Sequence, residues 1–188
     1  MKLDIFSFSM AILGIMISVY LYVVANLQIA LVPIVLLLSG ITFFYILSPS
    51  DVEQELEEAF KTKNLLFTGL ALVSFSVFSF FLRFLPLSVS QLSIFDAMLL
   101  GILMAVAEEF FFRGAITQYF ATRFNETAAV FFSGLIFAVY HVAVYSQNIT
   151  SLFYALLAGI VLSWIFLRTK SLTPTILAHV INNIIAVV

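Results

Sequence analysis

Residues 93–113 read SIFDAMLLGILMAVAEEFFFR, an apolar run that carries two adjacent glutamates near its end. A membrane-spanning helix needs about 20 predominantly apolar residues, and this run has that length. A charged side chain at membrane depth costs about 3 kcal/mol or more, so Glu108 and Glu109 are candidate functional residues. The two histidines of the chain, His141 and His179, also lie in apolar segments. Carboxylates and imidazoles transfer protons and bind metals, so these four side chains together indicate a buried site.

The composition is typical of a membrane protein. Of the 188 residues, 63% are hydrophobic and 10% are charged, whereas a soluble domain carries about 25% charged residues. Mean hydropathy is +1.18. We therefore expect an all-α fold, a polytopic transmembrane helical bundle in the cell membrane. The chain has no cysteine, which excludes disulfides and thiolate chemistry, and no basic stripe that would suggest nucleic acid as a partner.

Seven apolar segments have about the length of a membrane span. In chain order they are residues 5–25, 28–47, 65–85, 93–113, 128–145, 152–167 and 174–188. Two segments begin with capping signals. Ser93 with Asp96 resembles a capping box, and Thr173 before Pro174 is typical of an N-cap followed by proline. We expect the seven segments to pack as one integrated bundle.

A polar segment, residues 50–63, separates the second span from the third. It begins with the capping-box pair Ser50 and Glu53, and its apolar residues repeat at helical spacing. These apolar residues are Val52, Leu56, Ala59 and Phe60. We expect a short amphipathic helix at the membrane interface, either as an element that guards an entrance or, more simply, as a solvated linker. Its acidity argues against binding to anionic lipid.

The basic residues predict the orientation in the membrane. With seven spans, the N-terminus and the loops after spans two, four and six share one side. That side holds Lys2, Lys61, Lys63, Arg123, Arg168 and Lys170, and the opposite side holds Arg83. By the positive-inside rule, the N-terminus is expected in the cytoplasm and the C-terminus outside.

Spans four and five form a predicted antiparallel hairpin, which sets the depth of two candidate residues. Because Glu108 and His141 lie at nearly equal distances from the polar tip of the hairpin, we expect them at similar depth. His179 lies shortly after Pro174, roughly 8 Å inside the cytoplasmic end of span seven. All three reach one level if the hairpin tip extends beyond the bilayer, with Arg113 at the membrane edge. The expected site opens toward the cytoplasm, within reach of water.

Helical spacing predicts which side chains act together. Residues four apart share a helix face, so Arg113 can neutralise Glu109, whereas Glu108 points about 100° away. His179 and Asn183 also share a face. Each feature alone has a structural interpretation: an ion pair, an interhelical histidine hydrogen bond, and an asparagine that joins helices. Their conjunction favours a functional site.

Three short motifs resemble those of the CPBP family of intramembrane proteases, which includes type II CAAX prenyl endopeptidases and bacteriocin-processing or self-immunity proteins. Glu-Glu-x-x-x-Arg matches residues 108–113, Phe-x-x-x-His matches residues 137–141, and His-x-x-x-Asn matches residues 179–183. Their order and membrane setting also match, and no motif position is substituted. The similarity covers roughly residues 93–188, the abortive-infection-type core. The N-terminal helices and linker in residues 1–92 carry no motif that we assign.

The resemblance implies an endopeptidase that hydrolyses a peptide bond of a membrane-anchored or prenylated, CAAX-type substrate. Four residues are catalytic by this resemblance, and two support them. The general base is Glu108, and His141 assists it. The oxyanion is stabilised by His179 and Asn183. The supporting residues are Glu109 and Arg113. No residue pattern identifies a prenyl pocket, so a lipidated peptide, another membrane-embedded peptide and a leader sequence are all consistent substrates.

The residues leave the need for a metal open. Glu108, His141 and His179 could supply a His₂Glu zinc site, and the family is often labelled metalloprotease on that ground. Asparagine is a poor zinc ligand, however, and the glutamate paired with Arg113 is poorly placed to serve twice. We expect a glutamate-type enzyme without a cofactor, with zinc as the alternative.

Two other functions would also use intramembrane glutamate and histidine. A proton- or cation-coupled transporter uses such residues as relays, but it predicts internal symmetry or broken helices, which the sequence does not show. A non-enzymatic immunity or scaffold protein would retain the fold and would not depend on Glu108. The three motifs together favour the protease.

Overall fold

The computed structural model describes residues 5–23, 28–47, 93–145 and 148–187, and it confirms an all-α fold for them. The elements are α1 (Ile5–Val23), a 3₁₀ turn η1 (Gln28–Ala30), α2 (Leu31–Leu47), α5 (Ile94–Glu108), a π-helix η3 (Glu109–Thr117), α6 (Gln118–Arg123), α7 (Glu126–Tyr145), α8 (Ile149–Thr169) and α9 (Thr173–Val187). The predicted span at residues 65–85 and the predicted amphipathic helix at residues 50–63 lie outside the described residues.

One described helix, α8, is long and apolar enough to cross a membrane, judged by its length and composition. Shorter apolar stretches occupy Ser9–Leu21, Leu31–Thr42 and Glu126–Val142. Seven spans therefore stay a prediction. Large apolar side chains are exposed along α1, α2, α7 and α8, among them Met16, Val23, Val35, Val139 and Ile149. An exposed apolar surface of this extent suits contact with lipid.

The helical run that carries the two glutamates is longer than the predicted span. Ser93 caps it as predicted, because its hydroxyl oxygen lies 3.1 Å from the Asp96 backbone nitrogen and 2.6 Å from the Asp96 carboxylate. The elements α5, η3 and α6 then follow one another directly as far as Arg123. Arg113 has no exposed surface and lies inside this run. The helix therefore continues past the predicted end of the span at Arg113, and the small and apolar residues that follow it also pack inward. The position of Arg113 at the membrane edge stays a prediction.

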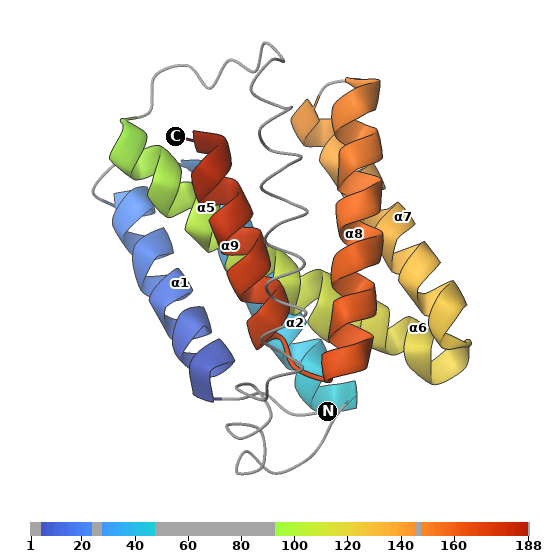
Figure 1. Ribbon diagram of the computed structural model, residues 1–188. Coiled ribbons are helices and arrows are strands. Elements are labelled where there is room, and N and C mark those ends of the chain that lie inside the picture. The colour runs from blue at the N-terminus through green and yellow to red at the C-terminus, as the bar shows by residue number, and fades with distance from the viewer. Residues whose placement is uncertain (1–4, 24–27, 48–92, 146–147, 188) are drawn as a thin grey trace.

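The helices form two groups with α9 between them. Figure 1 shows α7 and α8 as an antiparallel hairpin on one side and α1 with α5 on the other. Helix α9 packs against both α5 and α8, and α2 packs against α5 and η3. The main core joins these elements around the fully buried side chains of Leu103, Phe110, Phe166 and Ile176. Core packing thus accounts for part of the phenylalanine-rich sequence.

Glycines allow the backbones of α7 and α8 to approach closely. A Cβ atom on Gly159 would lie 2.8 Å from the Cα atom of Gly134, and one on Gly134 would lie 2.9 Å from the backbone nitrogen of Ile160. No side chain fits at this crossing without separating the helices. The crossing therefore fixes the tilt of α7, the helix that carries His141.

A tight turn between α8 and α9 sets the height of His179. Lys170 closes α8 in the left-handed conformation with a φ of 59°. Helix α9 begins at Thr173, and the Leu172 carbonyl accepts the first helical N–H group. The N-cap is thus Leu172, one residue before the prediction, and Pro174 lies within the first turn, where a missing N–H group leaves no helical bond unmade.

Candidate active site

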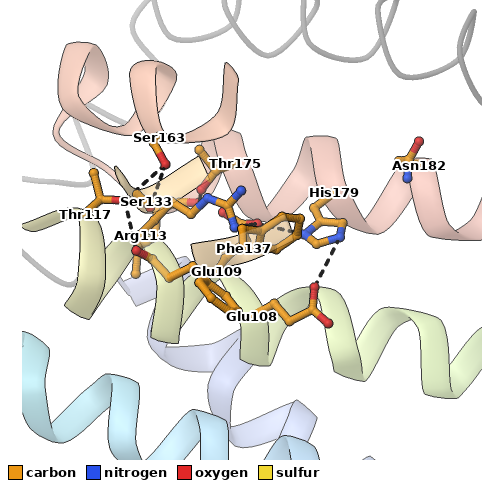
Figure 2. Close-up of polar contacts among 12 residues, drawn as sticks. Glu108, Glu109, Arg113, Thr117, Ser133, Phe137, Ser163, Thr175, His179 and Asn182 are labelled. Atoms are coloured by element: carbon orange, nitrogen blue, oxygen red, sulfur yellow. Dashed lines mark hydrogen bonds and ion pairs between the residues drawn. The ribbon is translucent and has the colours of Figure 1, made fainter. Parts of the chain in front are cut away.

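The carboxylate of Glu108 lies between the two histidine rings. Its Oε2 atom is 3.8 Å from Nε2 of His141 and 3.7 Å from Nε2 of His179. Figure 2 shows this carboxylate facing the His179 ring. Glu108 ends α5, His141 lies in α7 and His179 lies in α9. The prediction that three helices bring these side chains to one level is confirmed.

The opposite ring nitrogen of each histidine is held by an oxygen atom. Nδ1 of His141 lies 2.9 Å from the Phe137 carbonyl oxygen, and Nδ1 of His179 lies 2.7 Å from Oε1 of Glu109. A carbonyl or carboxylate oxygen only accepts, so each Nδ1 carries a hydrogen. In the neutral ring, Nε2 is then an acceptor directed at Glu108. Three acceptor atoms converge on one point, which a group with hydrogens to donate would stabilise.

Glu109 connects His179 to Arg113. Its Oε1 atom lies 2.7 Å from Nδ1 of His179 and 3.1 Å from Nη1 of Arg113. The Arg113 contact confirms the predicted pairing four residues apart; it is an ion pair rather than an aligned hydrogen bond. The guanidinium carbon of Arg113 also lies 4.4 Å from the centre of the Phe137 ring. Arg113 is therefore held by a carboxylate and by an aromatic face.

The ring of Phe137 packs against both histidines. Its centre lies 4.3 Å from that of His141 and 6.0 Å from that of His179. Phe112 meets the same ring edge-to-face at 4.9 Å. Because Phe137 also receives Arg113, one aromatic side chain fixes the orientation of three polar groups. Phe137 is the phenylalanine of the second motif, four residues before His141.

All five side chains of the site are buried, and the two farthest from solvent are Glu109 and Arg113. Glu108 is 4% exposed and each histidine is 7% exposed, whereas Glu109 and Arg113 are 0% exposed. Two carboxylates and one guanidinium leave one negative charge in a buried place, where unpaired charge is costly. One additional proton, on Glu108 or on His179, would bring the net charge of the group to zero.

The change from α-helix to π-helix falls between the two glutamates. Glu108 is the last residue of α5, and Glu109 is the first of η3. A π-helix closes i→i+5 hydrogen bonds and is frequent at functional sites. The spacing argument assumed α-helical geometry throughout, so the sequence did not indicate this change. Local geometry directs the two adjacent carboxylates to different partners.

Asn183 lies away from Glu108. Its Nδ2 atom donates to the Gly101 carbonyl oxygen in α5 at 3.0 Å. Gly101 precedes Glu108 by seven residues, which is about 10 Å along the helix axis. The neighbouring Asn182 accepts a hydrogen bond from the Tyr154 hydroxyl at 2.7 Å, and Figure 2 shows it beyond His179. In this structure Asn183 joins α9 to α5, in agreement with its structural interpretation. Its role at the oxyanion stays a prediction.

A second polar group, the hydroxyl cluster, was not identified from the sequence. It consists of Thr117, Ser133 and Ser163, which are fully buried and come from η3, α7 and α8. The Oγ1 atom of Thr117 lies 2.6 Å from Ser133 Oγ and 3.1 Å from Ser163 Oγ, and the two serine oxygens are 3.0 Å apart. The available signal was one small hydroxyl residue in each of three apolar segments, a weak pattern in any membrane sequence.

A metal site is not evident in the side-chain arrangement. Among residues 5–23, 28–47, 93–145 and 148–187, no group of three or more histidine, aspartate or glutamate side chains is arranged to hold a metal ion. Glu108, His141 and His179, the residues of the alternative zinc site, converge without forming such a group. We therefore derive no step that passes through a metal.

The comparison with protein families identifies the core. Residues 90–185 match the family described as type II CAAX prenyl endopeptidase Rce1-like. Neither the curated proteins nor the solved structures contain a match to this chain. The matched segment covers just over half of the chain and includes Glu108, His141, His179 and their neighbours described above. The chain therefore belongs to the Rce1-like type II CAAX prenyl endopeptidases of the CPBP family, a family of membrane-embedded proteases.

Proposed function

We propose that this protein is an intramembrane endopeptidase that hydrolyses a peptide bond of a membrane-anchored or prenylated peptide with water activated at Glu108. The supporting observation is the position of Glu108 Oε2, 3.8 Å from Nε2 of His141 and 3.7 Å from Nε2 of His179. These separations are too long for direct hydrogen bonds. A water molecule about 2.8 Å from each atom would bridge them and donate its two hydrogens to Glu108 and His141.

In the proposed reaction Glu108 is the general base. As the water oxygen attacks the scissile carbonyl carbon, its proton passes to Glu108, and a tetrahedral intermediate forms. His141 accepts a hydrogen bond from the second hydrogen of the water, which stays on the oxygen. This bond holds a lone pair of the water oxygen toward the carbonyl. The C–N bond then breaks, and the proton on Glu108 passes to the leaving amine. The products are a carboxylic acid and an amine, and the site returns to its starting state.

His179 is the proposed donor to the oxyanion. With a proton on Nε2 as well as on Nδ1, its ring would carry a positive charge close to both Glu108 and Glu109. A donor aimed at the oxyanion contributes roughly 3 kcal/mol to the stabilisation of the transition state. Glu109 supports this role because it fixes the His179 ring through Nδ1. Arg113 supports it because its guanidinium balances the charge of the Glu109 carboxylate. Asn183 was predicted to share the oxyanion; since its amide donates to Gly101, we assign it to helix contact in this proposal.

The substrate class follows from the family and from the location of the site. Glu108 and the histidines lie among helices rather than on an exposed loop, so the scissile peptide must enter the bundle. A peptide with a membrane anchor is already concentrated at that depth. A CAAX-type substrate, cleaved after a prenylated cysteine, is one such peptide.

A peptidase assay in detergent tests the proposal. Wild type is compared with Glu108→Gln and His141→Ala on a panel of prenylated and unprenylated membrane peptides, with Glu126→Gln as an exposed-carboxylate control. We expect cleavage by wild type and the control, and near-complete loss in the two site variants. Full activity of Glu108→Gln would exclude the proposed base. Glu108-dependent ion flux without cleavage would instead favour a transporter.

A further inference from the structure

Helix α2 packs directly on the backbone of the π-helix that carries Glu109 and Arg113. A Cβ atom on Gly40 would lie 2.5 Å from the carbonyl carbon of Phe110, 2.7 Å from its oxygen and 2.7 Å from the backbone nitrogen of Phe111. These are backbone atoms, which cannot turn aside as the end of a side chain can. Any residue larger than glycine at this position must displace α2 or η3. Gly40 lies before the matched segment, residues 90–185.

The other end of η3 is held by the hydroxyl cluster. The Thr117 hydroxyl donates to the Phe112 carbonyl oxygen at 2.9 Å. The spacing of five residues is that of the π-helical backbone bond itself. With that hydrogen used, Thr117 accepts from Ser133, and Ser133 in turn accepts from Ser163 at 3.0 Å. Figure 2 shows the cluster close to Arg113. Side chains of α7 and α8 thus stabilise the last turn of η3.

The geometry of η3 decides where Arg113 points. An α-helix has 3.6 residues per turn, and a π-helix has more because each bond spans one residue further. Between Glu108 and Arg113 the chain therefore turns through a smaller total angle than an α-helix would. A π-helix is the rarer conformation and persists where its surroundings hold it. Relaxation of η3 to α-helix would rotate Arg113 and Glu109 relative to Glu108 and His179.

We propose that Gly40 and Thr117 are positioning residues for the reaction, which hold η3 in π-helical geometry and thereby fix the Glu109–Arg113 pair beside His179. This inference rests on the proposed peptidase function. It gives α2, which lies outside the three motifs and the matched segment, a direct part in shaping the site. Gly40 acts on the first turn of η3 and Thr117 on the last.

The test measures kcat and KM separately, together with the thermal unfolding temperature in detergent. The variants are Gly40→Ala, Thr117→Val and Thr117→Ser, and the control is Gly14→Ala. A Cβ atom on Gly14 meets only side-chain ends, Cδ1 of Leu37 at 3.2 Å and Cδ1 of Leu103 at 3.3 Å. Thr117→Val keeps the shape but removes the hydroxyl, whereas Thr117→Ser keeps the hydroxyl.

We expect Gly40→Ala and Thr117→Val to lower kcat about tenfold to a hundredfold, the range for a misplacement of about 1 Å, with KM within about threefold. Thr117→Ser and Gly14→Ala should keep wild-type kcat. In the double variant Glu109→Gln with Thr117→Val, kcat should fall by less than the product of the two single effects. Both substitutions act through the same Glu109–Arg113 pair. If each variant acted only through a general loss of stability, their separate effects on kcat would multiply instead.

The two hypotheses fail in different ways. If Glu108→Gln is inactive while Thr117→Val has wild-type kcat, the positioning inference is wrong and the peptidase proposal stands. If the effects of Thr117→Val and Glu109→Gln on kcat multiply in the double variant, the positioning inference is also wrong. Full activity of Glu108→Gln contradicts the peptidase proposal and, with it, this inference. Should Gly40→Ala not fold, the Thr117 variants decide the outcome.

Discussion

The Nδ1 atom of His179 lies 2.7 Å from Oε1 of Glu109, while its Nε2 atom lies 3.7 Å from Oε2 of Glu108. The two adjacent glutamates thus hold one imidazole ring from opposite sides. One contact is short and buried, and the other leaves room for a further group. In the proposed mechanism Glu109 orients the ring, and Glu108 faces the substrate.

Glu109→Gln should lower stability and activity together. The amide can still approach His179, but it leaves Arg113 as a buried charge without a counter-ion, and removal of one partner from a buried pair costs about 3–5 kcal/mol. Thermal and chemical unfolding in detergent measure this loss. Glu109→Gln combined with Arg113→Met removes both charges, so we expect stability to recover while activity stays low. Recovery of both would show that the pair has no part in the reaction.

Asn183→Ala should affect stability more than chemistry. Its amide donates to Gly101 at 3.0 Å, and the loss of such a bond costs about 1 kcal/mol. We expect a small drop in unfolding temperature and a kcat close to wild type. His179→Ala serves as the contrast and should lose nearly all activity. An equal loss of kcat in both variants would return Asn183 to the oxyanion site.

Chelation should leave the activity unchanged. The proposed mechanism uses Glu108, His141 and His179 without a metal, so incubation with a strong zinc chelator followed by dialysis should not lower kcat. Metal analysis of the purified protein should give far less than one zinc per chain. Stoichiometric zinc that is required for turnover would overturn this expectation and make the three side chains ligands.

Gly134→Ala should disturb α7 through its crossing with α8. The added methyl would lie 2.6 Å from Cγ1 of Ile160 and 2.9 Å from its backbone nitrogen. Overpacking of this kind costs about 1–3 kcal/mol. We expect a lower unfolding temperature and, because α7 carries His141, a reduced kcat. Ala158→Gly, on the same helix pair but without added volume, should keep the activity within about threefold of wild type.

Residue types and helical spacing were enough to predict the all-α class, the cap at Ser93 and the convergence of Glu108, His141 and His179. These features depend on local chemistry and on the constant rise of a helix, so the order of residues determines them. The α-helical spacing of four residues also predicted the pairing of Glu109 with Arg113, which the structure forms within the π-helix. The three motifs were also visible as residue types at fixed spacing, and they identified the family.

The tertiary structure alone decided the contacts that depend on which helices meet. The spacing of His179 and Asn183 predicted a shared face of α9. Asn183 lies one helical turn beyond His179, however, and there its amide meets Gly101 of α5 rather than Glu108. The π-helical geometry after Glu108 requires outside support, from the close approach of Gly40 and from the hydroxyls of α7 and α8. Such support is a property of packing between distant segments, and no local period encodes it.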